Sequence, residues 1–167
     1  MAKPLLIILA GLPGSGKTYL AVALAKSLPA AHVSSDEIRF YLFNPLEYTR
    51  KAHEQVFDLF HQHISEWLNS GQNVIADATN LSWKNVAPLL NLAMETGAEI
   101  HSFMIYCPSA IRDKRLKARE EDAEGVIKAS RKMEKYANFE ADTTLDGTLP
   151  AEELVRCVRN VVYSDHG

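Results

Sequence analysis

The stretch LLIILAGLPGSGKT, residues 5–18, decides the fold of this chain. It begins with an uninterrupted apolar run at 5–10, which is too short for a helix and suits a strand that is covered on both faces. A glycine-rich turn follows, and a helical pattern then runs from about Gly16 to Leu28. The stretch therefore predicts a strand, a tight turn and a helix in direct succession.

The turn matches the pattern G-x-x-x-x-G-K-[ST], in which glycines let backbone N–H groups curl around phosphate oxygens. The helix that starts near Gly16 adds the positive end of its dipole. Lys17 supplies a mobile cation for the β- and γ-phosphates, and the Thr18 hydroxyl can bind Mg²⁺. We therefore expect ATP and Mg²⁺ at this loop. The residues expected to contact the nucleotide are Gly11, Pro13, Gly14, Ser15, Gly16, Lys17 and Thr18.

The rest of the chain alternates apolar runs with amphipathic helical patterns. This alternation predicts right-handed crossovers and a mainly parallel sheet, with functional residues at the carboxyl ends of the strands. We expect a single three-layer α/β domain over 1–167 with the P-loop NTPase fold, about five strands and helices on both faces. Further strands are expected to end near 34, to begin at 73, and to span 99–106 and 143–145; helices are expected at 49–69, up to 96, and at 109–119, 123–137 and 151–163.

The composition excludes several classes of function. The 167 residues have a formal net charge of -3 and a pI near 6.1, so any nucleic-acid contact must be a local basic feature. Cys107 and Cys157 lack the short spacing of a metal site or redox pair, which is typical of reduced cytoplasmic thiols. No apolar run approaches the roughly 18 residues of a membrane span, so we expect a cytoplasmic protein without a membrane partner.

The residues after the strand NVIAD distinguish between kinds of nucleotide-binding protein. This strand ends at Asp77, and the next residue is Ala78. Switches and motors that hydrolyse nucleotides often have a glutamate there to polarise water, and the Asn-Lys-x-Asp stretch that reads guanine is absent. Both observations favour transfer to an acceptor. Transfer needs a carboxylate for the acceptor's proton, a cation that holds the acceptor, and arginines near the moving group.

Polar residues at the ends of two predicted strands are candidates for these groups. Asp36 and Arg39 are three residues apart on a predicted helix and should share one face. A helix cap with an ion pair is the alternative interpretation. Asp77 and Asn80 are candidate substrate contacts, with Asp77 also orienting Mg²⁺ through water, and a simple turn is the alternative.

Residues 111–119, IRDKRLKAR, contain five basic residues and one acid. Arg112, Arg115 and Arg119 recur at helical spacing and predict a cationic stripe on one face. We expect this stripe on a mobile basic helical lid at about 108–137. A solvated basic face is the alternative interpretation.

The segments GLPGSGKT, VSSDEIR and VIADATN, with the arginines of 111–119, resemble the P-loop kinase family of polynucleotide 5′-hydroxyl kinases and zeta-toxin-like kinases. The resemblance implies that Asp36 is the general base and that Arg39 grips a phosphate of the acceptor. It also implies that Arg115 and Arg119 contact the ATP phosphates during transfer, so that Lys17, Asp36 and Arg119 form the expected catalytic set.

The favoured function is therefore an ATP-dependent kinase that transfers the γ-phosphate to the 5′-hydroxyl end of a DNA or RNA strand. The DATN segment at 77–80 is similar to the pattern of polynucleotide kinases, and this resemblance favours that branch. A small-molecule kinase for a sugar, nucleoside, nucleotide-sugar or antibiotic is the alternative, because EEDAEG at 120–125 is acidic where several polynucleotide kinases have a further arginine. A non-catalytic ATP-binding module is the third hypothesis.

Overall fold

The computed structural model describes residues 2–164, which form one five-stranded sheet and seven helices. All five strands are parallel, in the order β2-β3-β1-β4-β5. The strands are β1 (Leu5–Ala10), β2 (Ala30–Ser34), β3 (Asn73–Asp77), β4 (Glu99–Tyr106) and β5 (Thr143–Asp146). The helices are α1 (Lys17–Ser27), α2 (Ser35–Leu42), α3 (Arg50–Asn69), α4 (Trp83–Thr96), α5 (Ser109–Arg119), α6 (Ala123–Tyr136) and α7 (Ala151–Ser164). The predicted α/β fold is confirmed, including the strand expected at 143–145.

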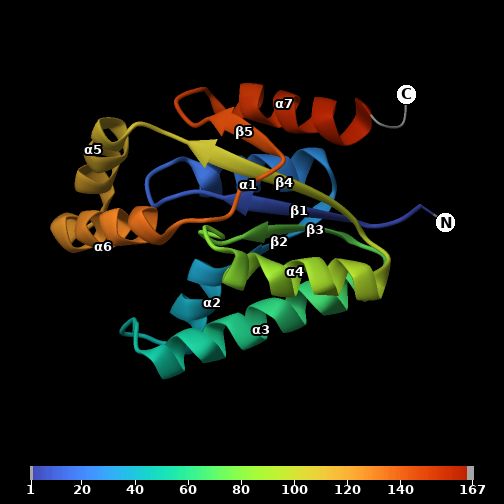
Figure 1. Cartoon of the computed structure of the whole chain (residues 1–167), viewed down its shortest axis with the longest axis horizontal. Coiled ribbons are helices and arrows are strands. Elements are labelled where there is room, and N and C mark those ends of the chain that lie inside the picture. Colours follow the sequence, from blue (N-terminus) through green and yellow to red (C-terminus); the bar gives the residue numbers. More distant parts are fainter. Residues whose placement is uncertain (1, 165–167) are drawn as a thin grey trace.

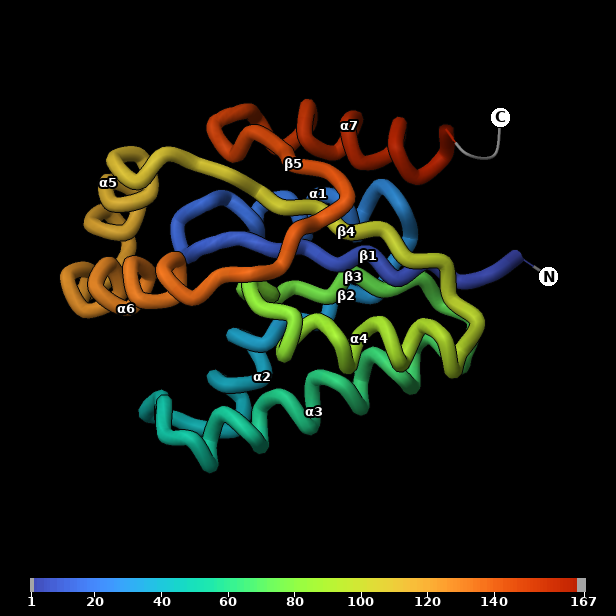
Figure 2. Tube along the Cα trace, in the orientation of Figure 1, coloured from blue at the N-terminus to red at the C-terminus, as the bar shows by residue number. Residues whose placement is uncertain are grey.

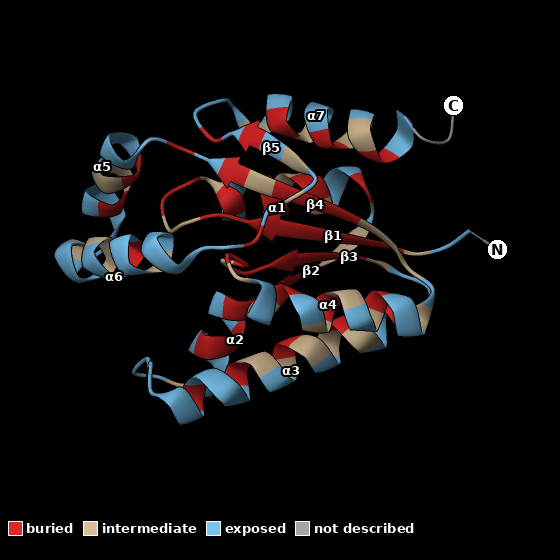
Figure 3. Cartoon of the chain, in the orientation of Figure 1, coloured by how far each residue is buried: buried red, intermediate tan, exposed pale blue. Residues whose placement is uncertain are grey.

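The central strand β1 is buried along its whole length. Its side chains alternate between two cores: Leu6 and Ile8 pack with α3 and α4, whereas Ile7 and Leu9 pack with α1 and α7. Figure 1 shows these two helix pairs on opposite faces of the sheet, and Figure 3 shows burial concentrated in the strands and on the inward helix faces. Burial on both faces explains the uninterrupted apolar run of this strand.

The carboxyl ends of the parallel strands meet at one edge of the sheet. The turn between β1 and α1, the start of α2 and the turn after β3 all lie at this edge (Figure 1). Helices α5 and α6 pack against each other beyond the same edge, as the chain trace in Figure 2 shows. The segment expected as a lid therefore corresponds to this helix pair, next to the expected nucleotide loop.

Local hydrogen bonding and backbone conformation set the start of α3 and the end of α4. The Thr49 hydroxyl accepts a hydrogen bond from the Ala52 backbone N–H at 3.1 Å and caps the start of α3. Gly97 has a φ of 73°, a left-handed conformation that ends α4.

None of the helices within residues 2–164 is long and apolar enough to cross a membrane.

Candidate active site

The turn between β1 and α1 forms a backbone cradle. Gly14 and Gly16 have φ angles of 85° and 98°, which residues with side chains rarely adopt. A Cβ atom on Gly14 would lie 2.9 Å from the Arg112 carbonyl oxygen, so α5 packs closely against this point. The Ser15 hydroxyl is buried and has no hydrogen-bond partner among residues 2–164. The tight turn and this unpartnered hydroxyl fit a loop whose inner groups bind phosphate oxygens.

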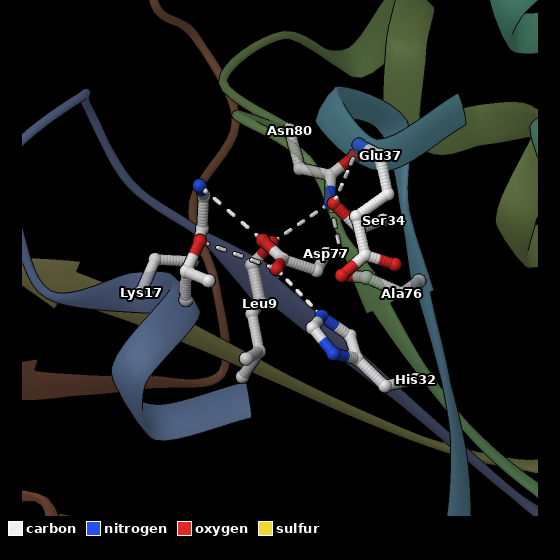
Figure 4. A network of polar contacts seen from close by, with 9 residues as sticks. Leu9, Lys17, His32, Ser34, Glu37, Ala76, Asp77 and Asn80 are labelled. Atoms are coloured by element: carbon white, nitrogen blue, oxygen red, sulfur yellow. Dashed lines mark hydrogen bonds and ion pairs between the residues drawn. The ribbon is translucent and has the colours of Figure 1, made fainter. Parts of the chain in front are cut away.

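Asp77, at the end of β3, gathers polar side chains beside the cradle (Figure 4). Lys17 Nζ lies 3.3 Å from Asp77 Oδ1. The Thr18 hydroxyl donates to Asp77 Oδ2 at 3.4 Å, and His32 Nε2 lies 2.7 Å from the same oxygen. The structure thus brings together three residues that the sequence indicates and one, His32, that it does not.

Asp77 is ionised although only 2 % of its surface is exposed. Burial alone would raise the pKa of Asp77, but the hydrogen bond from His32 and the charge of Lys17 outweigh it and hold that pKa below its ordinary value. An ionised carboxylate only accepts hydrogen bonds, and it also binds hard cations or their water ligands. The oxygens of Thr18 and Asp77 therefore form a donor set that fits Mg²⁺.

Asn80 is buried beside the same turn and bonds to the backbone. Its Nδ2 donates to the Leu9 carbonyl oxygen at 2.8 Å, while its Oδ1 has no partner among the described residues. The neighbouring Thr79 carbonyl accepts a hydrogen bond from the Gly11 N–H at 3.0 Å. These bonds tie the turn after β3 to the start of the cradle, so Asn80 positions backbone here. Its contact with an acceptor stays a prediction.

Asp36 lies in the first turn of α2, directly after β2. The Ser34 hydroxyl accepts a hydrogen bond from the Glu37 N–H at 3.2 Å and caps this helix. Ser34 pairs in register with Asp77, so α2 starts at the same edge of the sheet as the cradle. Asp36 is exposed and has no hydrogen-bond or ion-pair partner in the described part of the chain. Its carboxylate is therefore available to a bound molecule.

Arg39 is buried and contacts other residues of the chain through its guanidinium group. Its Nη1 donates to the Glu47 carbonyl oxygen at 2.9 Å, its Nη2 lies 3.5 Å from His53 Nδ1, and its guanidinium carbon lies 4.9 Å from the Tyr48 ring centroid. Burial and the Arg39 charge lower the pKa of His53, so the neutral ring faces Arg39. Helical spacing predicts that Asp36 and Arg39 share one face, but Asp36 is exposed, whereas Arg39 is buried and bonds to the segment between α2 and α3. The contact of Arg39 with an acceptor stays a prediction.

Arg112 does not belong to an exposed cationic stripe. It is 5 % exposed, donates to the Cys107 carbonyl oxygen at 2.9 Å and lies 3.4 Å from a Glu134 carboxylate oxygen. The expected stripe of three arginines is therefore wrong at this position. A buried arginine joins α5 to the end of β4 and to α6, because the face of α5 that carries Arg112 turns inward.

Arg115 and Arg119 lie on the side of α5 next to the cradle. Arg115 donates to the carbonyl oxygens of Gly14 at 3.1 Å and Gly147 at 3.0 Å. Arg119 is exposed and lies 3.2 Å from a Glu120 carboxylate oxygen. Both side chains are at least partly exposed beside Gly14 and Gly16, which fits the expectation of arginines near the nucleotide.

A pocket of about 440 Å³ opens between the cradle, α5 and the turn after β5. This volume is in the range of small-molecule sites. Its lining includes Gly16, Tyr19, Arg115, Arg119, Gly147 and Leu149. The position suits the base and sugar of a nucleotide whose phosphates lie in the cradle. Tyr19, Gly147 and Leu149 carry no motif, and only the packing of β5 beside β4 brings the last two to this place.

A protein-family model described as an AAA domain, AAA_33, matches residues 6–140. The chain belongs to the AAA_33 family. No curated protein gives a significant match to the sequence. The matched residues include the cradle, Asp36, Asp77, Arg115 and Arg119, whereas Gly147 and Leu149 of the pocket lie beyond the match.

Solved structures share the fold of this AAA_33 domain, and two of them are described as kinases. A candidate kinase from Chloroflexus aurantiacus superposes with a TM-score of 0.77 at 21% identity, over 98% of both chains. The APS kinase CysC of Mycobacterium tuberculosis, solved with AMPPNP and APS, gives a TM-score of 0.73 at 16% identity, over 97% of this chain and 99% of that one. A Pnkp1/Rnl/Hen1 complex chain gives 0.62 at 27% identity, over 69% of this chain and 40% of that one. The fold is that of P-loop kinases.

The substitution Gly147→Ala will weaken AMPPNP binding by this AAA_33 domain about tenfold, because overpacking costs roughly 1–3 kcal/mol. A Cβ atom on Gly147 would overlap the Ser15 carbonyl oxygen and lie 3.0 Å from the Tyr106 carbonyl oxygen, so the cradle must shift. Isothermal titration calorimetry measures the affinity. Gly71→Ala is the control. Its φ of 84° makes alanine unfavourable there, but nothing lies within 4 Å of its Cβ position, so the affinity for AMPPNP should not change. Unchanged affinity in Gly147→Ala would contradict the expectation that the cradle holds the nucleotide phosphates.

Proposed function

We propose that this AAA_33 domain transfers the γ-phosphoryl group of ATP to an acceptor hydroxyl. The observation that carries the proposal is the position of Asp36, an exposed and unpaired carboxylate at the edge of the sheet that holds the cradle and Asp77. A carboxylate there can take the proton of a hydroxyl that is bound in front of the outermost phosphate. Membership of the AAA_33 family and the P-loop kinase fold support the same class of reaction.

The cradle and its neighbours would neutralise the phosphates. Lys17 lies 3.3 Å from Asp77 Oδ1, and its flexible stem allows it to turn to the β- and γ-phosphates instead. The Thr18 hydroxyl and, through water, Asp77 would hold Mg²⁺, which supplies positive charge at the phosphate oxygens. Arg115 and Arg119 would add charge near the transferring group from the wall of the pocket.

The proposed transfer is a single displacement. The acceptor oxygen forms a bond to the γ-phosphorus while the bond from that phosphorus to the β–γ bridging oxygen breaks, and ADP leaves. The acceptor's proton passes to the Asp36 carboxylate. Proton abstraction by a positioned carboxylate contributes about 10²–10⁴-fold to such a step.

The favoured acceptor is the 5′-hydroxyl end of a DNA or RNA strand. The resemblance of the DATN segment at 77–80 to polynucleotide kinases supports this choice, as does the similarity to a chain of the Pnkp1/Rnl/Hen1 RNA repair complex. In this proposal Arg39 contacts a phosphate of the acceptor, for which it must give up the Glu47 carbonyl or the Tyr48 ring.

A small hydroxyl compound is the second candidate acceptor. The similarity to the APS kinase extends over nearly the whole of both chains, whereas the Pnkp1 complex chain is matched over less than half of its length. The enclosed position of Arg39 and the acidic residues 120–125 also favour a small acceptor over a long polyanion.

The deciding experiment offers γ-labelled ATP and Mg²⁺ with 5′-hydroxyl DNA and RNA oligonucleotides beside a panel of sugars, nucleosides and other small alcohols. Label on an oligonucleotide end, transferred less efficiently as salt rises, supports the favoured acceptor. Label on a small alcohol only supports the second candidate. ATP binding without transfer to any compound would leave a nucleotide-binding module and overturn the proposal.

A further inference from the structure

His32 lies on β2, the strand next to β3, which ends at Asp77. In the parallel pair of β2 and β3, His32 is level with Ile75 and Ser34 is level with Asp77. Because strand side chains alternate between faces, His32, Ile75 and Asp77 share one face of the sheet, and Ile75 packs in the core that includes α1. The ring of His32 therefore reaches Asp77 Oδ2 diagonally, at 2.7 Å, with only 13% of its side chain exposed (Figure 4).

The three polar partners of Asp77 differ in whether they can break their contact with its carboxylate when nucleotide binds. Lys17 and Thr18 belong to the cradle, and in the proposed function both turn toward the phosphates and Mg²⁺. His32 is part of a strand in the sheet and has no such second task. When nucleotide binds, His32 is thus the one side chain of these three that stays with the buried carboxylate. A buried carboxylate that loses its partners is costly, so this contact favours nucleotide binding.

The direction of the hydrogen bond follows from the charge of Asp77. An ionised carboxylate has no proton to donate, so His32 Nε2 carries the hydrogen and donates it to Oδ2. His32 holds Oδ2, to which Thr18 also donates, and this contact favours one orientation of the carboxylate, with Oδ1 3.3 Å from Lys17 Nζ. Hydrogen bonds of this kind fix the direction of metal-binding side chains in proteins.

We propose that His32 is a positioning residue for the nucleotide site: it holds the Asp77 carboxylate in place while Lys17 and Thr18 move to the bound nucleotide and its Mg²⁺. The inference rests on the proposed function, because it takes the triphosphate to lie in the cradle. It does not depend on which acceptor receives the phosphoryl group.

Binding of Mg²⁺·AMPPNP tests the inference without turnover. His32→Phe, which keeps a ring but removes the donor, will weaken binding about 10- to 100-fold in titration calorimetry. His32→Gln, which places an amide donor near the position of Nε2, will recover most of the affinity. In an Asp77→Ala background, which removes the acceptor of the His32 hydrogen bond, His32→Phe will cost less than about threefold, because the two residues act through one contact.

Ile75→Val is the matched control, at the same level of the sheet and on the same face. It will lower Tm by about 2–4 °C and leave the affinity for Mg²⁺·AMPPNP unchanged. Should His32→Phe fail to fold, the pair His32→Gln and His32→Leu gives the same comparison between a donor and none. The inference is overturned by wild-type affinity in the variants without a donor, or by an equal loss in the Asp77→Ala background. Tight binding without transfer to any alcohol would overturn the proposed kinase activity alone.

Discussion

Asp36→Ala will lower kcat by about 10²–10⁴-fold, the usual contribution of a general base, and will leave the Kd for ATP within about twofold of wild type. The carboxylate acts on the acceptor's proton and is not expected to bind the nucleotide, because it lies in the first turn of α2 and not in the cradle. Steady-state transfer to the acceptor gives kcat, and titration calorimetry with AMPPNP gives the affinity. Asp36→Asn should behave in the same way, since an amide is not a base.

Glu37→Ala is the control for this prediction. Glu37 is the adjacent acid, so it matches Asp36 in charge, exposure and helical turn. We expect its replacement to change kcat by less than about threefold. A loss of affinity for ATP as large as the loss of kcat in Asp36→Ala would remove Asp36 from the role of base.

Lys17→Met will lower kcat by about 10²–10³-fold, the usual effect of removing one group that stabilises charge in the transition state. Methionine keeps most of the stem but removes the cation, so the γ-phosphate loses its mobile partner. The substitution also leaves Asp77 without its ion pair, and the free energy of unfolding should fall by about 1–3 kcal/mol. Transfer kinetics and urea unfolding measure the two effects.

Lys26→Met is the matched control, since Lys26 lies on α1 as well but at its far end and exposed. It should leave both transfer and stability near wild type, because isolated exposed charges contribute little. Wild-type turnover in Lys17→Met would contradict the proposed neutralisation of the phosphates.

The sequence was most informative where chemistry depends on neighbours along the chain. The turn at 11–18 needs glycines at fixed spacing because left-handed backbone angles occur there, at Gly14 and Gly16. The same locality made α2 predictable, since acids in its first turn follow a strand and the Ser34 cap. Lys17, Thr18 and Asp77 came together as expected, because parallel strands end at one edge.

The parts that the sequence did not predict depend on the register and packing of distant segments. His32 reaches Asp77 only because β2 pairs with β3 in one register, and nothing in the local pattern around His32 indicates that contact. Arg112 fits a cationic stripe by spacing alone, yet the packing of α5 against α6 and the end of β4 turns it inward. Gly147 lies beside the cradle because β5 pairs with β4, and no sequence motif predicts its close approach to Ser15.

The most direct test of the central claim is a crystal structure of this domain with Mg²⁺·AMPPNP. The account predicts that the triphosphate lies in the loop 11–18 and that its γ-phosphorus faces the Asp36 carboxylate across about 6 Å, a gap that one hydroxyl fills with a hydrogen bond on one side and a near-attack contact on the other. A nucleotide bound outside the cradle, or a γ-phosphate more than about 10 Å from Asp36 with protein between them, would contradict it.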